Sequence, residues 1–334
     1  MRSFRDGDMQ NILITGGSGV IGSHLADALL ERGYSVTVID NLATGKIKNV
    51  EHNLDNPNFQ IINDTIMNER MMEELVRRCS AVYHLAAAVG VKYICEDPLQ
   101  GILTNVKGTE IVLDLAFKYW KRVVFASTSE IYGRSDRVPF EEDSERILGS
   151  TKVDRWSYST AKALDEHLCF AYAEKGLHVA IVRYFNSYGP RIDERGYGSV
   201  VAQFIRQALR NEPITVHGDG GQSRCFTYIE DTVKGTILAG TRREASGEAF
   251  NIGNNHETTI RELAEMIKSL TGSKSEIVMV PYEKIFGERY EDTRRRIPSI
   301  SKAKQKLGFA PGIDLSEGLK RTIEWAKENY RLEQ

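Results

Sequence analysis

A glycine-rich loop between an apolar run and an amphipathic segment constrains the fold of this chain more than any other part of its sequence. The loop reads Thr-Gly-Gly-Ser-Gly-Val-Ile-Gly over residues 15–22, with glycines three residues apart at Gly16, Gly19 and Gly22. The apolar run at 11–14 predicts a strand before the loop, and the periodicity of 23–32 predicts a helix after it. Glycines let the backbone turn tightly and approach a pyrophosphate at a helix N-terminus. The loop therefore predicts a dinucleotide-binding site.

An acidic residue follows at the distance that such a loop requires. Residues 34–40 are rich in β-branched side chains and predict a second strand, which ends at Asp40, 18 residues after Gly22. A carboxylate at this point accepts hydrogen bonds from the ribose hydroxyls of a dinucleotide and repels a 2′-phosphate. We therefore expect NAD rather than NADP, a preference that the nearby Lys46 and Lys48 weaken slightly.

Strands alternate with helices through the first half of the chain. Further strands are predicted at 59–62, 81–85, 122–127 and 178–183, and further helices at 68–78, 104–119 and 159–174. The alternation predicts an α/β fold in which a doubly wound parallel sheet is covered by helices on both faces. Beyond residue 186 glycines cluster and the elements shorten. We expect a cofactor-binding domain with the catalytic residues over 1–186 and a smaller, partly discontinuous α/β substrate-binding region over 187–334.

Composition excludes several classes of protein. Of 334 residues, 44 are Lys or Arg and 46 are Asp or Glu, so the net charge of −2 gives no general attraction to nucleic acid or to an anionic membrane. No uncharged apolar run approaches the roughly 20 residues that span a bilayer, and the polar first ten residues do not resemble a signal peptide. The cysteines lie far apart, at Cys79, Cys95, Cys169 and Cys225. We expect a cytoplasmic enzyme with no metal site, no nucleic-acid partner and no membrane association.

Two segments carry the side chains that we expect to do chemistry. Residues 127–133 read Ser-Thr-Ser-Glu-Ile-Tyr-Gly directly after a buried strand, where a doubly wound sheet binds its ligands. Tyr158 and Lys162 are four residues apart at the start of a predicted helix and therefore project from one face. A lysine ammonium and a nicotinamide cation near the phenol are expected to lower the phenol pKa, so that Tyr158 acts as a base.

These motifs, in this order, resemble the extended short-chain dehydrogenase/reductase family, and within it the nucleotide-sugar epimerases, dehydratases and decarboxylases. The resemblance covers nearly the whole chain and includes, besides the residues above, the segments 84–87, 183–191, 214–220, 222–228, 251–253 and 298–303. It implies a Rossmann fold, an NAD cofactor, a UDP-sugar substrate and a homodimer. In this family NAD takes a hydride from C4 of the sugar, while the tyrosine takes the hydroxyl proton.

The resemblance also implies a role for individual residues. Those implied in catalysis are Thr128, Ser129, Glu130, Tyr158, Lys162 and Arg296. Those implied in cofactor binding are Gly16, Gly19, Val20, Ile21, Gly22, Asp40, Asn41, Asp64, Thr65, Leu85, Ala86, Ala87, Asn105, Ser127, Tyr158, Lys162 and Tyr184. Those implied in substrate binding are Lys92, Asn186, Arg191, Thr215, His217, Arg224 and Arg294. Guanidinium groups grip a diphosphate bidentately, which is the physical case for the arginines.

Two residues indicate what happens to the 4-keto sugar. Glu130 stands where simple 4-epimerases tend to carry a small residue, and a carboxylate there can move a proton at C5. The segment 292–300 resembles the part of UDP-glucuronate decarboxylases in which an arginine, here Arg296, precedes x-Pro-Ser/Asp-Ile. That cation is expected to hold the sugar carboxylate or to deliver a proton after carbon dioxide leaves. We therefore favour decarboxylation of UDP-glucuronate to UDP-xylose.

The sequence leaves alternatives open. The context of Tyr158 and the segment 84–92 are closer to epimerase-like members. A 4-epimerase of UDP-glucose or UDP-glucuronate and an NDP-sugar 4,6-dehydratase therefore remain alternatives. Lys92 and Tyr93 either contact the sugar carboxylate or form an ordinary loop. A non-catalytic NAD-binding module is disfavoured because the catalytic set is complete, and a simple reductase would release its cofactor.

The expected homodimer would be built on the predicted helices 104–119 and 159–174. Their apolar positions Ile111, Leu115, Leu164 and Leu168 fit an exposed interface, and packing in the core of the chain explains them as well.

Overall fold

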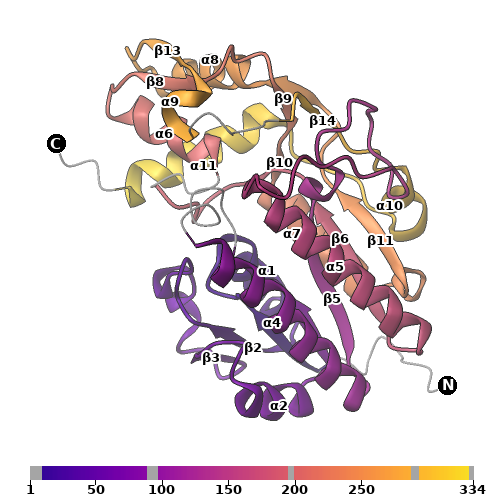
Figure 1. Cartoon of the computed structure of the whole chain (residues 1–334). Coiled ribbons are helices and arrows are strands. Elements are labelled where there is room, and N and C mark those ends of the chain that lie inside the picture. The colour runs from indigo at the N-terminus through magenta and orange to yellow at the C-terminus, as the bar shows by residue number, and fades with distance from the viewer. Residues whose placement is uncertain (1–9, 89–96, 195–198, 287–292, 331–334) are drawn as a thin grey trace.

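A seven-stranded, entirely parallel sheet forms the centre of the protein (Figure 1). The computed structural model describes residues 10–88, 97–194, 199–286 and 293–330. In spatial order the strands are β11 (Glu248–Ile252), β6 (Val179–Tyr184), β5 (Arg122–Thr128), β4 (Ala81–His84), β1 (Asn11–Thr15), β2 (Ser35–Asp40) and β3 (Phe59–Asn63). The chain reverses its direction of progress across the sheet between β1 and β4. This order confirms the predicted doubly wound fold and places the ligand crevice at the carboxyl ends of the strands.

Helices cover both faces of the sheet. On one face α1 (Val20–Leu30) packs beside α7 (Ile229–Thr241), and on the other face lie α2 (Glu69–Arg78), α4 (Pro98–Lys118) and α5 (Arg155–Glu174). Alternation along β1 explains the two layers: Ile12 and Ile14 belong to the core under α1, whereas Leu13 belongs to the core under α2. Both faces of the strands are apolar because both are covered.

Three helices begin earlier than their periodicity predicts. The helix expected at 23–32 begins at Val20, directly after the glycine loop. The helix expected at 104–119 begins at Pro98, because Asp97 caps it by accepting a hydrogen bond from the Gln100 amide at 3.0 Å. The helix expected at 159–174 begins at Arg155. Tyr158 therefore stands in the first turn of α5, which fixes it more firmly than a position before the helix would.

The remaining elements gather above the carboxyl edge of the sheet (Figure 1). They include three small sheets, made of β8 (Ile214–His217) with β13 (Ile277–Val280), β7 (Ser187–Tyr188) with β10 (Thr227–Tyr228), and β9 (Ser223–Cys225) between β12 (Glu257–Thr259) and β14 (Arg295–Arg296). Helices α6 (Val200–Leu209), α8 (Ile260–Thr271), α9 (Tyr282–Phe286) and α11 (Leu315–Asn329) surround them. Helix α10 (Ser301–Leu307) is an exception, because it packs against β11 and α7 of the large sheet (Figure 1). The division at residue 186 remains a prediction for the folding units, since β11 and α7 from the second segment lie in the layers of the large sheet.

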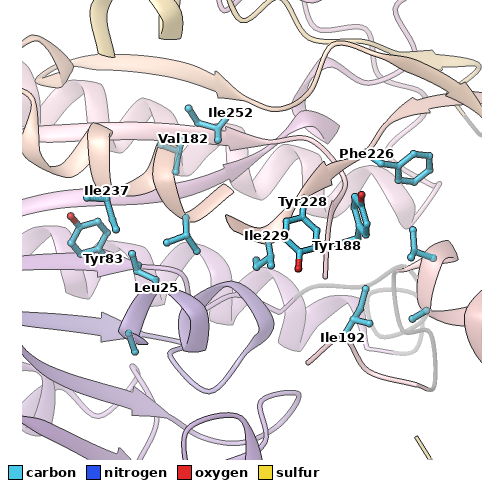
Figure 2. Close-up of a cluster of buried hydrophobic side chains, with 14 of the residues drawn as sticks. Leu25, Tyr83, Val182, Tyr188, Ile192, Phe226, Tyr228, Ile229, Ile237 and Ile252 are labelled. Carbon is cyan, nitrogen blue, oxygen red and sulfur yellow. The ribbon is translucent and has the colours of Figure 1, made fainter. Parts of the chain in front are cut away.

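One hydrophobic cluster joins the two parts of the chain. Figure 2 shows it running from Leu25 of α1 and Tyr83 of β4, past Val182 of β6, to Tyr188 and Phe226 in the second segment. All five side chains are at most 4% exposed. Because such a core is close-packed, it fixes the small sheets relative to the carboxyl ends of the central strands.

The apolar positions expected at a dimer interface divide between core and surface. Ile111 is buried in the core under α2, and Leu115 and Leu168 are partly buried against neighbouring core clusters. The expectation of exposure is wrong for Ile111, because α2 covers that turn of α4. Leu164 is 48% exposed. No helix among the described residues is long and apolar enough to cross a membrane.

Candidate active site

The glycine loop packs too closely for side chains. Gly16 has a φ of +70°, and a Cβ there would lie 2.7 Å from the Ala86 amide nitrogen. A Cβ on Gly22 would lie 2.4 Å from the Gly16 carbonyl oxygen. Helix α1 follows Gly19, and no side chain caps the amides of its first turn. The loop thus forms a backbone cradle at a helix N-terminus, which fits the pyrophosphate of a dinucleotide.

Asp40 ends β2 beside this loop. Its Oδ2 accepts a hydrogen bond from the Ser18 amide at 2.9 Å, and its Oδ1 accepts one from the Leu42 amide at 2.8 Å. Burial raises the pKa of Asp40, and the two amides oppose that rise. The carboxylate is held at the place where the ribose of a dinucleotide on the glycine loop would lie, so the loop and the acid fit NAD together.

The other predicted cofactor positions follow the carboxyl ends of the central strands. Asn41 directly follows β2, and Tyr184 is the last residue of β6. Asp64 and Thr65 follow β3, and Leu85, Ala86 and Ala87 follow β4. Val20 and Ile21 open α1. Asn105 of α4 reaches the same edge, where its side chain accepts a hydrogen bond from the Ala88 amide at 2.8 Å and donates one to the Ala88 carbonyl. The structure therefore brings the predicted cofactor residues to one edge of the sheet.

The Ser/Thr/Glu segment turns sharply at the end of β5. Thr128 is the last residue of the strand, and its hydroxyl accepts a hydrogen bond from the Glu130 amide at 3.2 Å. Ser129 and Glu130 open a short 3₁₀ helix, η4 (Ser129–Tyr132). The Ser159 hydroxyl donates to the Glu130 carbonyl oxygen at 2.8 Å, which ties this turn to the helix that carries Tyr158.

Tyr158 and Lys162 are both nearly inaccessible, at 8% and 1% exposure. Burial, and after it the charges of Glu130 and Asp165, raise the pKa of Tyr158, and only the Thr128 hydroxyl lowers it. Lys162 is not among the groups that shift the pKa of Tyr158 in this structure, and burial lowers the pKa of Lys162 itself. The lowering expected from Lys162 together with a nicotinamide cation stays a prediction. The Lys162 ammonium donates to the Ala126 carbonyl oxygen at 2.9 Å and lies 4.5 Å from the centre of the Phe125 ring.

An ion pair behind the site was not predicted from the sequence. Arg183 of β6 grips Glu166 of α5 with two hydrogen bonds, of 2.9 and 2.6 Å, and also donates to the Tyr132 hydroxyl at 2.8 Å. The Ser127 hydroxyl, expected at the cofactor, donates to the same Glu166 carboxylate. An arginine inside a predicted buried strand was the available signal, because a buried cation needs a partner.

Two of the predicted arginines lie side by side. Arg224 of β9 and Arg296 of β14 are paired across a parallel ladder, so their side chains share one face of the small sheet. They are only 9% and 6% exposed. The Arg296 Nη1 lies 3.8 Å from the Glu130 Oε1. The structure thus places Glu130, which follows β5, beside the buried Arg296 of the second segment, with Arg224 next to Arg296 on the same face.

The remaining predicted substrate residues have partners of their own. Arg294 is exposed and pairs with Asp219 at 2.9 Å, while Arg191 pairs with Asp27 of α1 at 2.7 Å. The side-chain amide of Asn186 donates to the Cys225 carbonyl oxygen at 3.0 Å. Thr215 and His217 lie on β8, where two glutamines donate to the Thr215 hydroxyl. Lys92 and Tyr93 lie outside the described residues.

Among the residues that the structure describes, no group of three or more His, Cys, Asp or Glu side chains could hold a metal ion. The fold and the site instead define an NAD-dependent enzyme of the extended short-chain dehydrogenase/reductase class. Its family follows from comparison with known proteins. The family model described as GDP-mannose 4,6 dehydratase matches residues 13–322, and the chain belongs to this family.

Individual relatives in this family act on nucleotide sugars, as their names state. The UDP-N-acetyl-alpha-D-glucosaminuronate decarboxylase of Bacillus cytotoxicus is 46% identical, over 95% of this chain and 97% of that protein. The UDP-glucuronic acid decarboxylase 1 of Danio rerio is 39% identical, over 95% of this chain and 73% of that protein. The solved structure of UDP-glucuronic acid 4-epimerase from Bacillus cereus, in complex with UDP-glucuronic acid and NAD, is 31% identical with a TM-score of 0.86, and covers 96% of this chain and 100% of that one. The chain is an enzyme of the nucleotide-sugar decarboxylase, epimerase and dehydratase class, and its cofactor is NAD.

Proposed function

We propose that the protein decarboxylates a UDP-hexuronate through a 4-keto intermediate, converting UDP-glucuronate to UDP-xylose. The observation that carries this proposal is the buried Arg296 beside Glu130, with Arg224 on the same face of the small sheet. A buried arginine can bind the C6 carboxylate of a hexuronate, and a glutamate beside it can direct a proton to C5 after carbon dioxide leaves. The decarboxylases among the relatives support this reaction over epimerisation and dehydration.

Oxidation at C4 depends on the tyrosine and its neighbours. The glycine loop would hold the pyrophosphate of bound NAD, Asp40 would hold its ribose hydroxyls, and Lys162 would contact its nicotinamide ribose. Bound NAD supplies a reversible hydride acceptor at C4 and is not consumed. Tyr158 takes the proton from the C4 hydroxyl, and Thr128 hydrogen-bonds the same oxygen. Because burial raises the pKa of Tyr158, the base form needs the positive charges of Lys162 and the cofactor close by.

Loss of carbon dioxide follows from the ketone. A keto group at C4 makes the C6 carboxylate a β-keto acid, so the C5–C6 bond breaks and its electrons form the C4–C5 enolate. Arg296 orients the carboxylate before cleavage, and Glu130, with Ser129, directs a proton to C5 afterwards. The hydride then returns to C4, and Tyr158 returns its proton to the C4 oxygen. The net change consumes one proton and releases one carbon dioxide.

The nucleotide lies over the second segment in this proposal. Arg224 and Arg294 bind the diphosphate, Asn186 and Arg191 support it, and the strand from Thr215 to His217 flanks the base. The ion pairs of Arg191 and Arg294 would open or rearrange to admit phosphate. The exposed Arg294 pair is screened by solvent and contributes little to stability, so a dianionic ligand competes with it readily.

A second substrate is favoured by a specific observation. The Bacillus cytotoxicus relative acts, by its name, on a sugar with an acetamido group at C2. The same chemistry at C4, C5 and C6 would apply to such a substrate here, since none of those steps involves C2. The two candidates therefore differ in the pocket around C2 rather than in mechanism.

The deciding experiment incubates the protein with NAD and either UDP-glucuronate or its 2-acetamido counterpart. Nuclear magnetic resonance and mass spectrometry then follow the nucleotide sugar. Loss of carbon dioxide with retained NAD supports the proposal and identifies the C2 substituent. A product of unchanged mass with inverted C4 would replace it with epimerisation, and loss of water from a neutral NDP-glucose would replace it with dehydration.

Glu130→Gln should separate the two halves of the reaction. The substitution keeps the size of the side chain and removes its proton-transfer capacity, so C4 oxidation should continue while the C5 step slows by about 10²-fold. Reduced cofactor should accumulate during turnover, which its near-ultraviolet absorbance measures. Glu141→Gln, on an exposed loop nearby, is the matched control. Unchanged turnover in Glu130→Gln would rule out the proton-directing role.

We further propose a homodimer that uses the exposed apolar side chains of α4 and α5. Leu99, Ile102 and Leu103 near the start of α4 and Leu164 on α5 are between 40% and 67% exposed. Helices α4 and α5 pack against each other, so these side chains can form one patch. A second copy would cover the patch by packing the same two helices against it.

Leu103→Glu tests this interface. A charge in the patch should weaken association at least about tenfold, because it would be desolvated in the dimer. Sedimentation velocity over a range of concentrations measures the change. Val278→Glu, at an exposed apolar position on β13, should leave association unchanged. A wild-type chain that sediments as a monomer at high concentration would contradict the proposal.

We also place the enzyme in the cytoplasm. Cys79, Cys169 and Cys225 carry free thiols that are buried in the fold, which suits a reducing compartment. Cell fractionation with an antibody to the chain tests this location.

A further inference from the structure

Asp165 is a buried acid that the proposed mechanism does not use. It lies on α5, three residues after Lys162 and seven after Tyr158, so all three project from one side of the helix. Its exposure is 0%. Apart from the Thr109 hydroxyl, which stabilises its charged form, neither carboxylate oxygen has a hydrogen-bond partner among the described residues. A carboxylate in such a place requires a compensating charge.

The other acid on this side of the helix is already neutralised. Glu166 is held by Arg183 through two hydrogen bonds and also accepts a hydrogen bond from the Ser127 hydroxyl. Lys162 has only a carbonyl oxygen and an aromatic ring as its close partners. Asp165 is the first of the charges that oppose the effect of burial on Lys162. Asp165 is therefore the acid that most favours the charged form of Lys162, and the two side chains share one buried side of α5.

A chain of hydroxyl and imidazole groups also ends at Asp165. The Thr15 hydroxyl oxygen accepts a hydrogen bond from the Ala86 amide at 3.1 Å and lies 2.7 Å from His84 Nδ1. On the other side of the ring, His84 Nε2 lies 3.2 Å from the Thr109 hydroxyl oxygen. Burial lowers the pKa of His84 to about 3, so its ring is neutral and carries one proton. We assign that proton to Nε2, with Thr15 donating to Nδ1. Thr109 then accepts from His84 and turns its own proton toward Asp165, as an ionised carboxylate requires.

The groups around Asp165 can be named from each packed element. Helix α5 contributes Tyr158, Lys162, Glu166 and Cys169, α4 contributes Thr109, and β4 contributes the neutral His84. Burial raises the pKa of Asp165 to about 6, and Lys162 opposes that rise. Above this pH the carboxylate is ionised beside the lysine.

We propose that Asp165 is a positioning residue that keeps Lys162 charged inside the buried site and thereby sets the pH range of the Tyr158/Lys162 pair. The proposal rests on the proposed function only in taking C4 oxidation as the step that this pair performs. Without the negative charge, Lys162 would lose its proton at lower pH. Tyr158 would also lose its proton at lower pH, because Asp165 disfavours the phenolate. Both limits of activity would therefore move in the acidic direction.

Asp165→Asn tests the proposal in the full chain with NAD bound. Reduced cofactor formed in a single turnover of UDP-hexuronate is measured from acidic to alkaline pH. We expect both limbs of the profile to move down by about one pH unit or more, with the rate at the new optimum within about fivefold of the wild-type rate. Asp165→Glu should restore the wild-type profile in part. Glu174→Gln, an exposed acid on the same helix, should leave it unchanged.

Two outcomes would overturn the proposal. One is a folded Asp165→Asn protein whose rate falls equally at every pH, which a purely structural role predicts. The other is a protonated carboxyl band in the infrared spectrum of the wild-type protein at mildly alkaline pH that is absent from the spectrum of Asp165→Asn, which would show that Asp165 is neutral. If the wild type reduces no cofactor with either UDP-hexuronate, the proposed function has failed instead, and the infrared measurement still decides the state of Asp165.

Discussion

Tyr158→Phe should abolish oxidation at C4, with a loss of about 10³-fold or more in the first half-reaction. The substitution removes one oxygen from a side chain that is 8% exposed and leaves the ring to pack as before. Without the phenolate, the C4 hydroxyl has no base at hand, since Lys162 is charged and the Thr128 hydroxyl is a weaker acceptor. The loss should appear with every nucleotide sugar, because all of them pass through the 4-ketone.

The measurement is the reduced-cofactor absorbance after rapid mixing of the NAD-loaded protein with UDP-glucuronate. Tyr172→Phe, on the same helix with its hydroxyl on Asp114, removes an equivalent oxygen away from the site and should retain full activity. Thermal unfolding of both variants should match that of the wild type. If Tyr158→Phe still reduces the cofactor at more than a tenth of the wild-type rate, another base acts at C4.

Much of the architecture was predictable from short-range patterns. The loop that contains Gly16 and Gly22 admits no Cβ, and that requirement is visible as glycine in the sequence. Asp40 was found because the length of a βαβ unit fixes its distance from the loop. The four-residue spacing of Tyr158 and Lys162 put both on one helix face, and the structure buries both there.

The electrostatics could not be predicted in the same way. The charge state of a buried group depends on neighbours that are distant in sequence. Arg183 of β6 pairs with Glu166, so Asp165 is, among the described residues, the nearby acid without a cationic partner that can stabilise charged Lys162. The pKa of Tyr158 was expected to fall because the positive charges of Lys162 and the nicotinamide were considered and burial was not. Burial by the surrounding elements dominates that pKa, and burial depends on the whole fold.

The register of the small sheets was equally hidden. The resemblance separates Arg296 from Arg294 in the run of three arginines, but nothing in the sequence says which of their side chains turn inward. Pairing of β14 with β9 turns Arg296 inward beside Arg224, while Arg295 pairs with Glu257 at the surface. A shift of one residue would exchange the inward and outward side chains, so the register decides which arginine reaches Glu130.

Arg296→Gln should lower kcat/KM for UDP-glucuronate on the order of 10³-fold, because it removes the buried cation proposed to hold the sugar carboxylate and takes away the ion-pair partner of the partly exposed Glu130. The same variant should oxidise a neutral UDP-glucose at C4 about as well as the wild type does. A rise in KM with kcat retained would assign Arg296 to holding the sugar carboxylate. Release of an unreduced 4-keto pentose would assign it to protonation after carbon dioxide leaves.

Arg295→Gln is the control that the structure offers for this variant, since it removes the same charge one residue away. Its guanidinium is half exposed and pairs with Glu257, an interaction that solvent screens and that contributes little to stability. Activity of Arg295→Gln should therefore remain within about threefold of the wild type. Equal losses in the two variants would mean that the general charge of this segment, and not the inward register of β14, governs the reaction. A loss confined to Arg296→Gln ties decarboxylation to the one arginine that the small sheet delivers to Glu130.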